Sequence, residues 1–149
     1  MIRPTFKVAG VFSALEVAAS GLTAERGRMN VIASNLANAR TTRTEAGGPY
    51  RRVDPVFVAK PLDGAGFDPV LQRVSAVQIQ RLATDPRPGA MEYDPGHPDA
   101  NGDGYVEYPN VNVVTEMVNL MTASRAYEAG VTSIESIKAM ARAAIKIGA

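Results

Sequence analysis

The placement of proline constrains the fold of this chain more than any other feature of its sequence. Nine of the ten prolines fall between Pro49 and Pro109, and the tenth is Pro4. The segments 5–48 and 110–149 therefore contain none. Proline inside a helix removes a backbone hydrogen bond and costs about 3 kcal/mol. The sequence thus predicts two long helices that flank an irregular or β-rich middle segment.

The C-terminal flank carries a heptad repeat of mostly apolar residues, whose ten positions are separated alternately by four and by three residues. Eight of its ten positions are apolar. Asn112 is placed to cap the helix, and Glu116 lies near the positive end of the helix dipole. We expect a helix over residues 113–147, about 50 Å long at 1.5 Å per residue. The repeat comprises Val113, Met117, Leu120, Ser124, Tyr127, Val131, Ile134, Lys138, Ala141 and Ile145.

The N-terminal flank repeats leucine or methionine every seven residues, at Leu15, Leu22, Met29 and Leu36, with Ile32 beside them. Two glycines, at positions 21 and 27, interrupt this pattern. Each glycine lowers helix stability by up to about 1 kcal/mol relative to alanine. We therefore expect this helix to depend on packing and to close within the asparagine-containing segment 35–38.

The middle segment has the composition of short strands joined by turns. Residues 56–60 and 104–108 have strand character, and residues 77–80 alternate apolar and polar side chains. Turn sequences rich in Asp, Pro and Gly separate them. With 46% hydrophobic residues the chain can form a core, and it has no cysteine for disulfides or thiolate metal sites. These patterns predict an α+β fold, with paired terminal helices and a small β-rich middle domain.

Several motifs, taken in order along the chain, resemble those of the flagellar rod and hook protein family, and of its FlgC type in particular. They lie at 22–39, 47–52, 93–112 and 116–128, so that the resemblance runs from about residue 12 to residue 147 and leaves out the variable stretch 61–82. The motif residues that carry it are Asn35, Asn38, Asp94, Pro95, His97, Pro98, Asn110, Asn112, Ser124 and Tyr127.

The resemblance implies a structural subunit of the proximal rod of the bacterial flagellar basal body. Residues 1–40 and 110–149 would form a helical assembly domain in the inner tube, and residues 41–109 a small outer domain. Implied partners are copies of itself, the rod proteins FliE, FlgB and FlgF, and the flagellar type III export apparatus. The rod spans the periplasm, and its subunits are exported without a cleaved signal peptide.

We name the apolar repeat positions of the two predicted helices their seams. We expect both seams to form the assembly interface, because the last turns of the second helix are apolar over an arc too wide for one partner helix to cover. This expected interface comprises Leu15, Leu22, Met29, Ile32, Leu36, Val113, Met117, Leu120, Tyr127, Val131, Ile134, Ala141 and Ile145.

One alternative is a monomeric binding module with a polar or calcium-binding loop at 94–104. Asp99, Asn101 and Asp103 imitate the start of a calcium-binding loop, but its twelfth position is Asn110 instead of a glutamate. His97 is the only histidine and has no cysteine to complete a metal site. We expect no enzyme, no cofactor and no metal. The net charge of +1 argues against a nucleic-acid surface, and no apolar run reaches membrane-spanning length.

Overall fold

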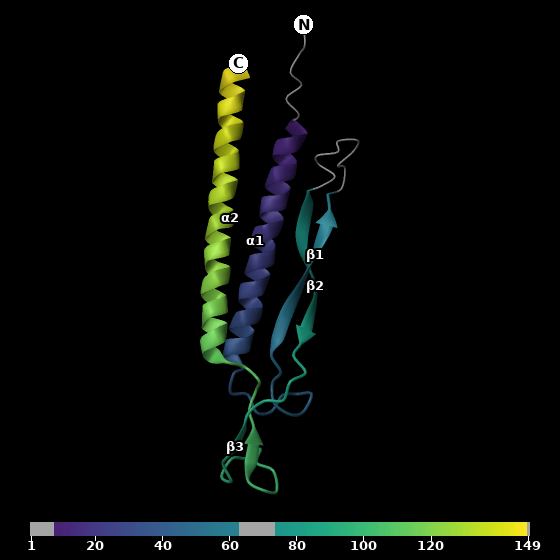
Figure 1. The fold of residues 1–149 in the computed structure, drawn as a ribbon, viewed down its shortest axis with the longest axis vertical. Coiled ribbons are helices and arrows are strands. Elements are labelled where there is room, and N and C mark those ends of the chain that lie inside the picture. The colour runs from purple at the N-terminus through teal and green to yellow at the C-terminus, as the bar shows by residue number, and fades with distance from the viewer. Residues whose placement is uncertain (1–7, 63–73, 149) are drawn as a thin grey trace.

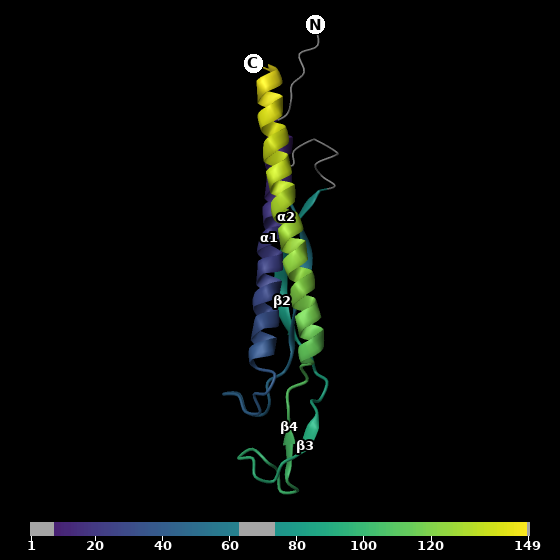
Figure 2. The ribbon, with the colours of Figure 1, turned by 90° about the vertical axis from the view of Figure 1, so that its left-hand side faces the viewer.

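A computed structural model describes residues 8–62 and 74–148 of the chain. The elements are the helix α1 (Val8–Ala37), the strands β1 (Val53–Pro61), β2 (Ser75–Thr84), β3 (Met91–Tyr93) and β4 (Tyr105–Glu107), and the helix α2 (Val113–Gly148). The molecule is elongated, and the start of α1 and the end of α2 lie at the end opposite the β3–β4 hairpin (Figures 1 and 2).

The two helices lie antiparallel, side by side along most of the length of α1 (Figure 1). The two most buried side chains of α2 are Glu116 and Ala123, and Gly130 follows them one heptad later on the same row. A Cβ atom at Gly130 would lie 2.7 Å from Leu22 Cδ2 of α1. Small residues on this row therefore let the two helix backbones approach closely.

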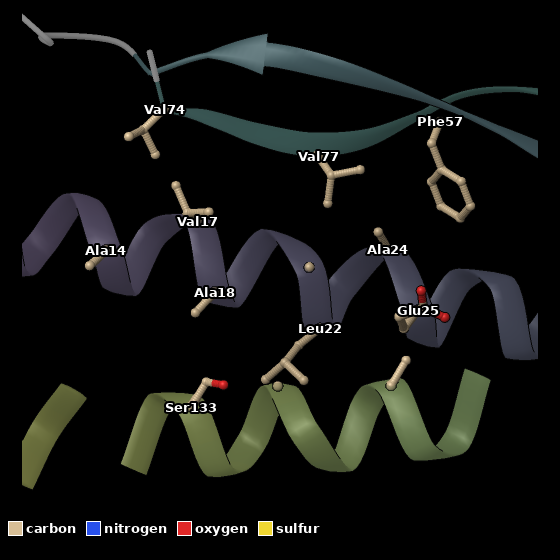
Figure 3. Close-up of a pocket in the computed structure, with 13 residues that line it drawn as sticks. Ala14, Val17, Ala18, Leu22, Ala24, Glu25, Phe57, Val74, Val77 and Ser133 are labelled. Carbon is tan, nitrogen blue, oxygen red and sulfur yellow. The ribbon is translucent and has the colours of Figure 1, made fainter. Parts of the chain in front are cut away.

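Strands β1 and β2 form an antiparallel hairpin that packs along α1, on the side away from α2 (Figures 1 and 3). The hairpin register shifts between Val56 and Phe57, as at a β-bulge. The Ser20 hydroxyl of α1 accepts a hydrogen bond from the Val77 backbone N–H (3.0 Å). At Gly27 a Cβ atom would lie 2.5 Å from Ile79 Cδ1. Helix α1 is thus the central element, covered by α2 on one side and by the hairpin on the other.

Strands β3 and β4 form a second antiparallel hairpin, which projects beyond the start of α2 (Figure 2). Its long connection ends at Gly104, whose φ of 81° favours glycine. The Asn101 side-chain oxygen accepts backbone hydrogen bonds from Asp103 (3.0 Å) and Tyr105 (2.9 Å), which closes the turn. Val106, 1% exposed, is the most buried side chain of this hairpin.

The structure confirms the predicted α+β class and both long helices. Asn112 caps α2 as expected, since its side-chain oxygen accepts the Thr115 N–H at 3.0 Å. The three predicted strand segments overlap β1, β2 and β4, whereas β3 was not predicted. Our expectations for residues 1–7 and 149 lie outside the described residues. Among the helices that the structure describes, none combines the length and hydropathy needed to cross a bilayer.

Candidate assembly interface

A buried hydrogen-bond network joins the end of α1, the start of β1 and the start of α2, and its centre is Asn35. This side chain is fully buried. Its Nδ2 donates to the Val53 carbonyl (2.9 Å) and to Glu116 Oε2 (3.0 Å). Its Oδ1 accepts from the Val53 N–H (3.0 Å) and from the Tyr50 hydroxyl (2.9 Å). All four hydrogen bonds available to the amide are made within the molecule, so Asn35 fixes how these segments meet.

Glu116 is also fully buried, although it is ionisable. Its Oε1 accepts hydrogen bonds from Arg52 Nε (2.8 Å) and Asn119 Nδ2 (3.3 Å). Arg52 also pairs with Asp54. Burial opposes the charged form of Arg52, but the hydrogen bonds to Asp54 and Glu116 outweigh it and raise the pKa of the guanidinium. The buried carboxylate of Glu116 is therefore paired and hydrogen-bonded, as a buried charge must be.

The motif residue Asn110 extends this network towards the middle segment. Its Oδ1 accepts the Arg52 N–H (2.8 Å), and its Nδ2 donates to the Arg87 carbonyl (3.1 Å). From the sequence, Glu116 was expected near the positive end of the helix dipole and in the motif at 116–128, and no role was expected for Tyr50 or Arg52. The motifs at 47–52 and 116–128 were the signals that could have identified this network.

The first turns of α2 present an apolar face that points away from α1. Large apolar side chains on this face are strongly exposed, with Val114 at 72% and Met121 at 58%. Folding of the described residues leaves this face uncovered, although a contiguous apolar patch on a soluble protein commonly marks an interaction site. We name it the outer face of α2; it comprises Val113, Val114, Met117, Val118 and Met121.

The residues of the expected interface divide between two environments. Ile32 is buried, and nine others are half-buried: Leu15, Leu22, Met29, Leu36, Leu120, Tyr127, Val131, Ile134 and Ala141. Val113, Met117 and Ile145 are exposed. The row of α2 that pairs with α1 inside one molecule shares Leu120, Tyr127, Ile134 and Ala141 with the predicted repeat, and otherwise runs through Ala123 and Gly130.

An apolar groove of about 670 Å³ runs along α1 between α2 and the β1–β2 hairpin (Figure 3). Small residues form much of its floor, including Ala18 and Gly21 of α1 and Gly130 of α2. Two polar side chains, Glu25 and Ser133, interrupt this apolar lining. Glu25 Oε2 accepts no hydrogen bond and lies 3.7 Å from Arg28 NH1.

Several polar side chains of the 94–104 loop are bonded within the molecule. Asp99 Oδ2 accepts from the Thr42 hydroxyl (2.8 Å), and its Oδ1 lies 3.5 Å from Arg43 NH1. His97 Nδ1 accepts the Asp99 N–H at 3.1 Å. Within residues 8–62 and 74–148, no group of three or more His, Cys, Asp or Glu side chains gathers where it could hold a metal ion. The loop geometry thus gives no support to the calcium-binding alternative.

The remaining motif residues act locally or lie at the surface. Asn38 Nδ2 donates to the Ser34 carbonyl (2.9 Å) and its Oδ1 accepts the Thr41 hydroxyl (3.2 Å), which closes the C-terminus of α1. Asp94 Oδ1 accepts the Gly96 N–H at 3.2 Å. The side chains of Pro95 and Pro98 are exposed, and that of Ser124 is half-buried on α2.

Comparisons with known proteins connect this geometry to one family. A family model described as flagella basal body rod protein matches residues 15–43, and one described as flagellar basal body rod FlgEFG protein C-terminal matches residues 103–147. The chain is 44% identical over 148 residues to the flagellar basal-body rod protein FlgC of Borreliella burgdorferi, covering 93% of this chain and 97% of that protein.

Two further relatives carry the same name. The chain is 40% identical over 149 residues to FlgC of Bacillus subtilis, covering 92% of this chain and 97% of that protein. It is 39% identical over 133 residues to FlgC of Escherichia coli O157:H7, covering 89% of this chain and 94% of that protein. Both matches extend over nearly the full length of each relative and include the middle segment.

Proposed function

Because this chain belongs to the FlgC family of flagellar basal-body rod proteins, we propose that it is a structural subunit of the proximal rod, which polymerises through its helices into a hollow shaft that transmits torque. Its role is mechanical. Burial of side chains between subunits, at about 25 cal/mol per Å² of apolar surface, stabilises the shaft without covalent bonds.

The observation that carries the proposal is the outer face of α2. One molecule leaves five large apolar side chains of this face exposed, and they occupy consecutive turns of a long, straight helix. Neighbouring subunits in a tube wall would cover such a face, since a heterologous contact repeated by rotation generates an extended assembly. We propose that this face, together with the seam residues of both helices, forms the assembly interface.

We extend the proposal to the roles of the two parts of the chain, to its neighbours in the rod and to its export. Residues 1–40 and 110–149 would serve as the helical assembly domain, and residues 41–109 as the outer domain. The neighbours would be copies of this chain and the rod proteins FliE, FlgB and FlgF. Export through the flagellar type III apparatus, without a cleaved signal peptide, would place the rod across the periplasm. The buried network of Asn35 and Glu116 supports a fixed orientation of the helices relative to the middle segment.

Complementation of a bacterium that lacks its own FlgC protein tests this function. We expect the intact chain to restore swimming and complete rods in micrographs of purified basal bodies. Met121→Asp, which places a charge on the outer face, should abolish both, because burial of an unpaired carboxylate costs several kcal/mol. Arg81→Asp in the exposed part of β2 is the matched control and should keep rods intact. Complete rods with Met121→Asp at normal protein levels would remove the outer face from the interface.

A further inference from the structure

The two ends of the molecule carry different surfaces (Figure 1). We name the end formed by the β3–β4 hairpin and its flanking residues the tip (residues 91–94 and 103–106). We name the opposite end, formed by the first turns of α1 and the last turns of α2, the tail (residues 10–14 and 137–146). Both ends have exposed side chains, and these carry charges of opposite sign.

The tip presents aromatic and apolar side chains on one face of its hairpin. Met91 and Tyr93 point to the same face because they are two residues apart in a strand, and Tyr105 lies directly opposite Tyr93. The two tyrosine rings pack edge to face with their centroids 5.2 Å apart. Tyr93 is nevertheless 64% exposed. This face is therefore an ordered apolar surface that the described residues leave uncovered.

Acidic side chains flank this apolar face at its ends, since Asp94 follows Tyr93 and Asp103 lies two residues before Tyr105, whereas Glu92 points to the opposite face of the hairpin. Glu92 and Asp103 have no ion-pair partner among the residues that the structure describes, and Asp94 accepts only the neighbouring Gly96 N–H. The cation nearby, Arg43, is already paired with Asp99. The tip thus carries unpaired negative charge.

The tail presents the opposite character. An apolar groove of about 260 Å³ lies between the helices, lined by Gly10, Val11, Ala14, Ile137, Met140, Ala141 and Ala144. Met140 at its rim is 64% exposed, and Ile145 is 71% exposed. Lys138, Arg142 and Lys146 are exposed on the same turns of α2, and in the described part of the chain none of them has an ion-pair partner.

We propose that the tip of one copy docks on the tail of a second copy, with Tyr93 against the apolar groove and the acidic side chains of the tip facing the basic side chains of α2. This contact rests on the proposed function, because a head-to-tail contact between two different surfaces builds a polar assembly in which every subunit points the same way. Opposite charges set the register and the apolar side chains supply most of the affinity.

Cysteine cross-linking tests the contact directly, because the chain contains no cysteine. Full-length Tyr93→Cys and Met140→Cys proteins would be mixed under mild oxidation and the cross-linked dimers quantified. We expect this pair to form dimers at least about tenfold faster than Tyr93→Cys mixed with Gln80→Cys, whose exposed cysteine in β2 lies outside both the tail and the outer face of α2. Equal rates for the two mixtures would overturn the proposal. If Tyr93→Cys disturbs the tip, as judged by circular dichroism, Met91→Cys takes its place.

Charge reversal provides a second, independent measurement. The change of Lys138, Arg142 and Lys146 to glutamate in the Met140→Cys protein should lower the cross-linked yield about tenfold or more, since facing like charges repel. Asp94→Lys with Asp103→Lys in the tip protein should restore the yield. Failure of the second change to restore the yield would show that these charges do not face each other.

Complementation separates this inference from the proposed function. If the unmodified chain restores rods but the tip and tail cysteines never cross-link, the docking proposal is wrong and the rod function stands. If the cysteines cross-link but the chain cannot restore rods, the function is wrong and the contact stands.

Discussion

At the scale of single residues, the polar network around Asn35 defines the geometry of the molecule. A buried carboxylate is costly unless it is paired, and Glu116 is paired with Arg52 and bonded to Asn35 and Asn119. Hydrophobic contacts alone permit sliding between a helix and its neighbours, whereas this network is satisfied in one arrangement only. The network therefore sets where α1, β1 and α2 meet.

We predict that Asn35→Ala lowers the free energy of unfolding by about 2–4 kcal/mol, because it leaves Glu116 Oε2 and both backbone groups of Val53 without their partner. Urea unfolding followed by circular dichroism measures this loss.

The matched control is Asn38→Ala, one turn further along the chain. Asn38 bonds to Ser34 and Thr41 near the surface, so its loss should cost at most about 1 kcal/mol. Equal costs for the two variants would show that the buried network contributes nothing special to stability.

At the scale of elements, Gly21 and Gly27 of α1 differ in their surroundings, although both interrupt the same heptad pattern in the sequence. Around Gly21 a Cβ atom would meet nothing within 4 Å, whereas at Gly27 it would meet Ile79 Cδ1 at 2.5 Å. Gly27 therefore permits the close contact between α1 and β2, and Gly21 contributes only flexibility within one molecule.

We predict that Gly21→Ala raises the free energy of unfolding by about 0.5–1 kcal/mol, because alanine is the better helix former. Gly27→Ala should gain less or destabilise, since the Ile79 side chain must move. Removal of its terminal methyl in a Gly27→Ala, Ile79→Val double variant should recover part of that difference, which thermal unfolding of the purified chain would measure. A double variant no better than the sum of its single changes would contradict this account.

Helix α2 can present either of two rows of residues, spaced seven apart, to α1 together with Leu120, Tyr127 and Ile134. One row runs through Met117 and Val131, and the other runs through Ala123 and Gly130. In the structure the row through Ala123 and Gly130 faces α1, and Met117 remains outside. Small residues allow the closer approach, and Glu116 on the same row is held by Asn35. The larger side chains are thereby left available for other subunits.

At the scale of the whole molecule, burial is concentrated at one end. Among the described residues, α1 has no buried side chain before Ala24 and α2 has none after Ala123. Glu116 and Asn35 belong to the same end. Towards the termini an open groove lies between the helices, and Gly10, Ala14, Ala141 and Ala144 form part of its lining, so little side-chain burial holds this part closed.

We predict graded hydrogen exchange in the isolated chain. Amides of residues 28–36 and 116–127 should exchange more than about tenfold more slowly than those of residues 10–16 and 137–146, because local opening needs less free energy where little is buried. Exchange measured by mass spectrometry would show the gradient. Uniform protection along both helices would mean that the helix pair opens as one unit and does not await neighbouring subunits.

The sequence by itself determined the features that depend on local chemistry. Proline-free flanks predicted both helices, Asn112 predicted the start of α2, and composition together with alternation at residues 77–80 predicted three of the strands. The four motifs indicated the family that the comparisons confirm. These predictions hold because helix propensity, capping and strand alternation act over a few neighbouring residues.

Only the tertiary structure decided which residues meet across the chain. Asn35 and Glu116 are separated by 81 positions, and nothing local marks them as partners. The choice of row on α2 was likewise ambiguous, since both rows satisfy the same period. It was decided by the close approach at Gly130 and by the need to pair a buried carboxylate, and both are properties of the packed molecule.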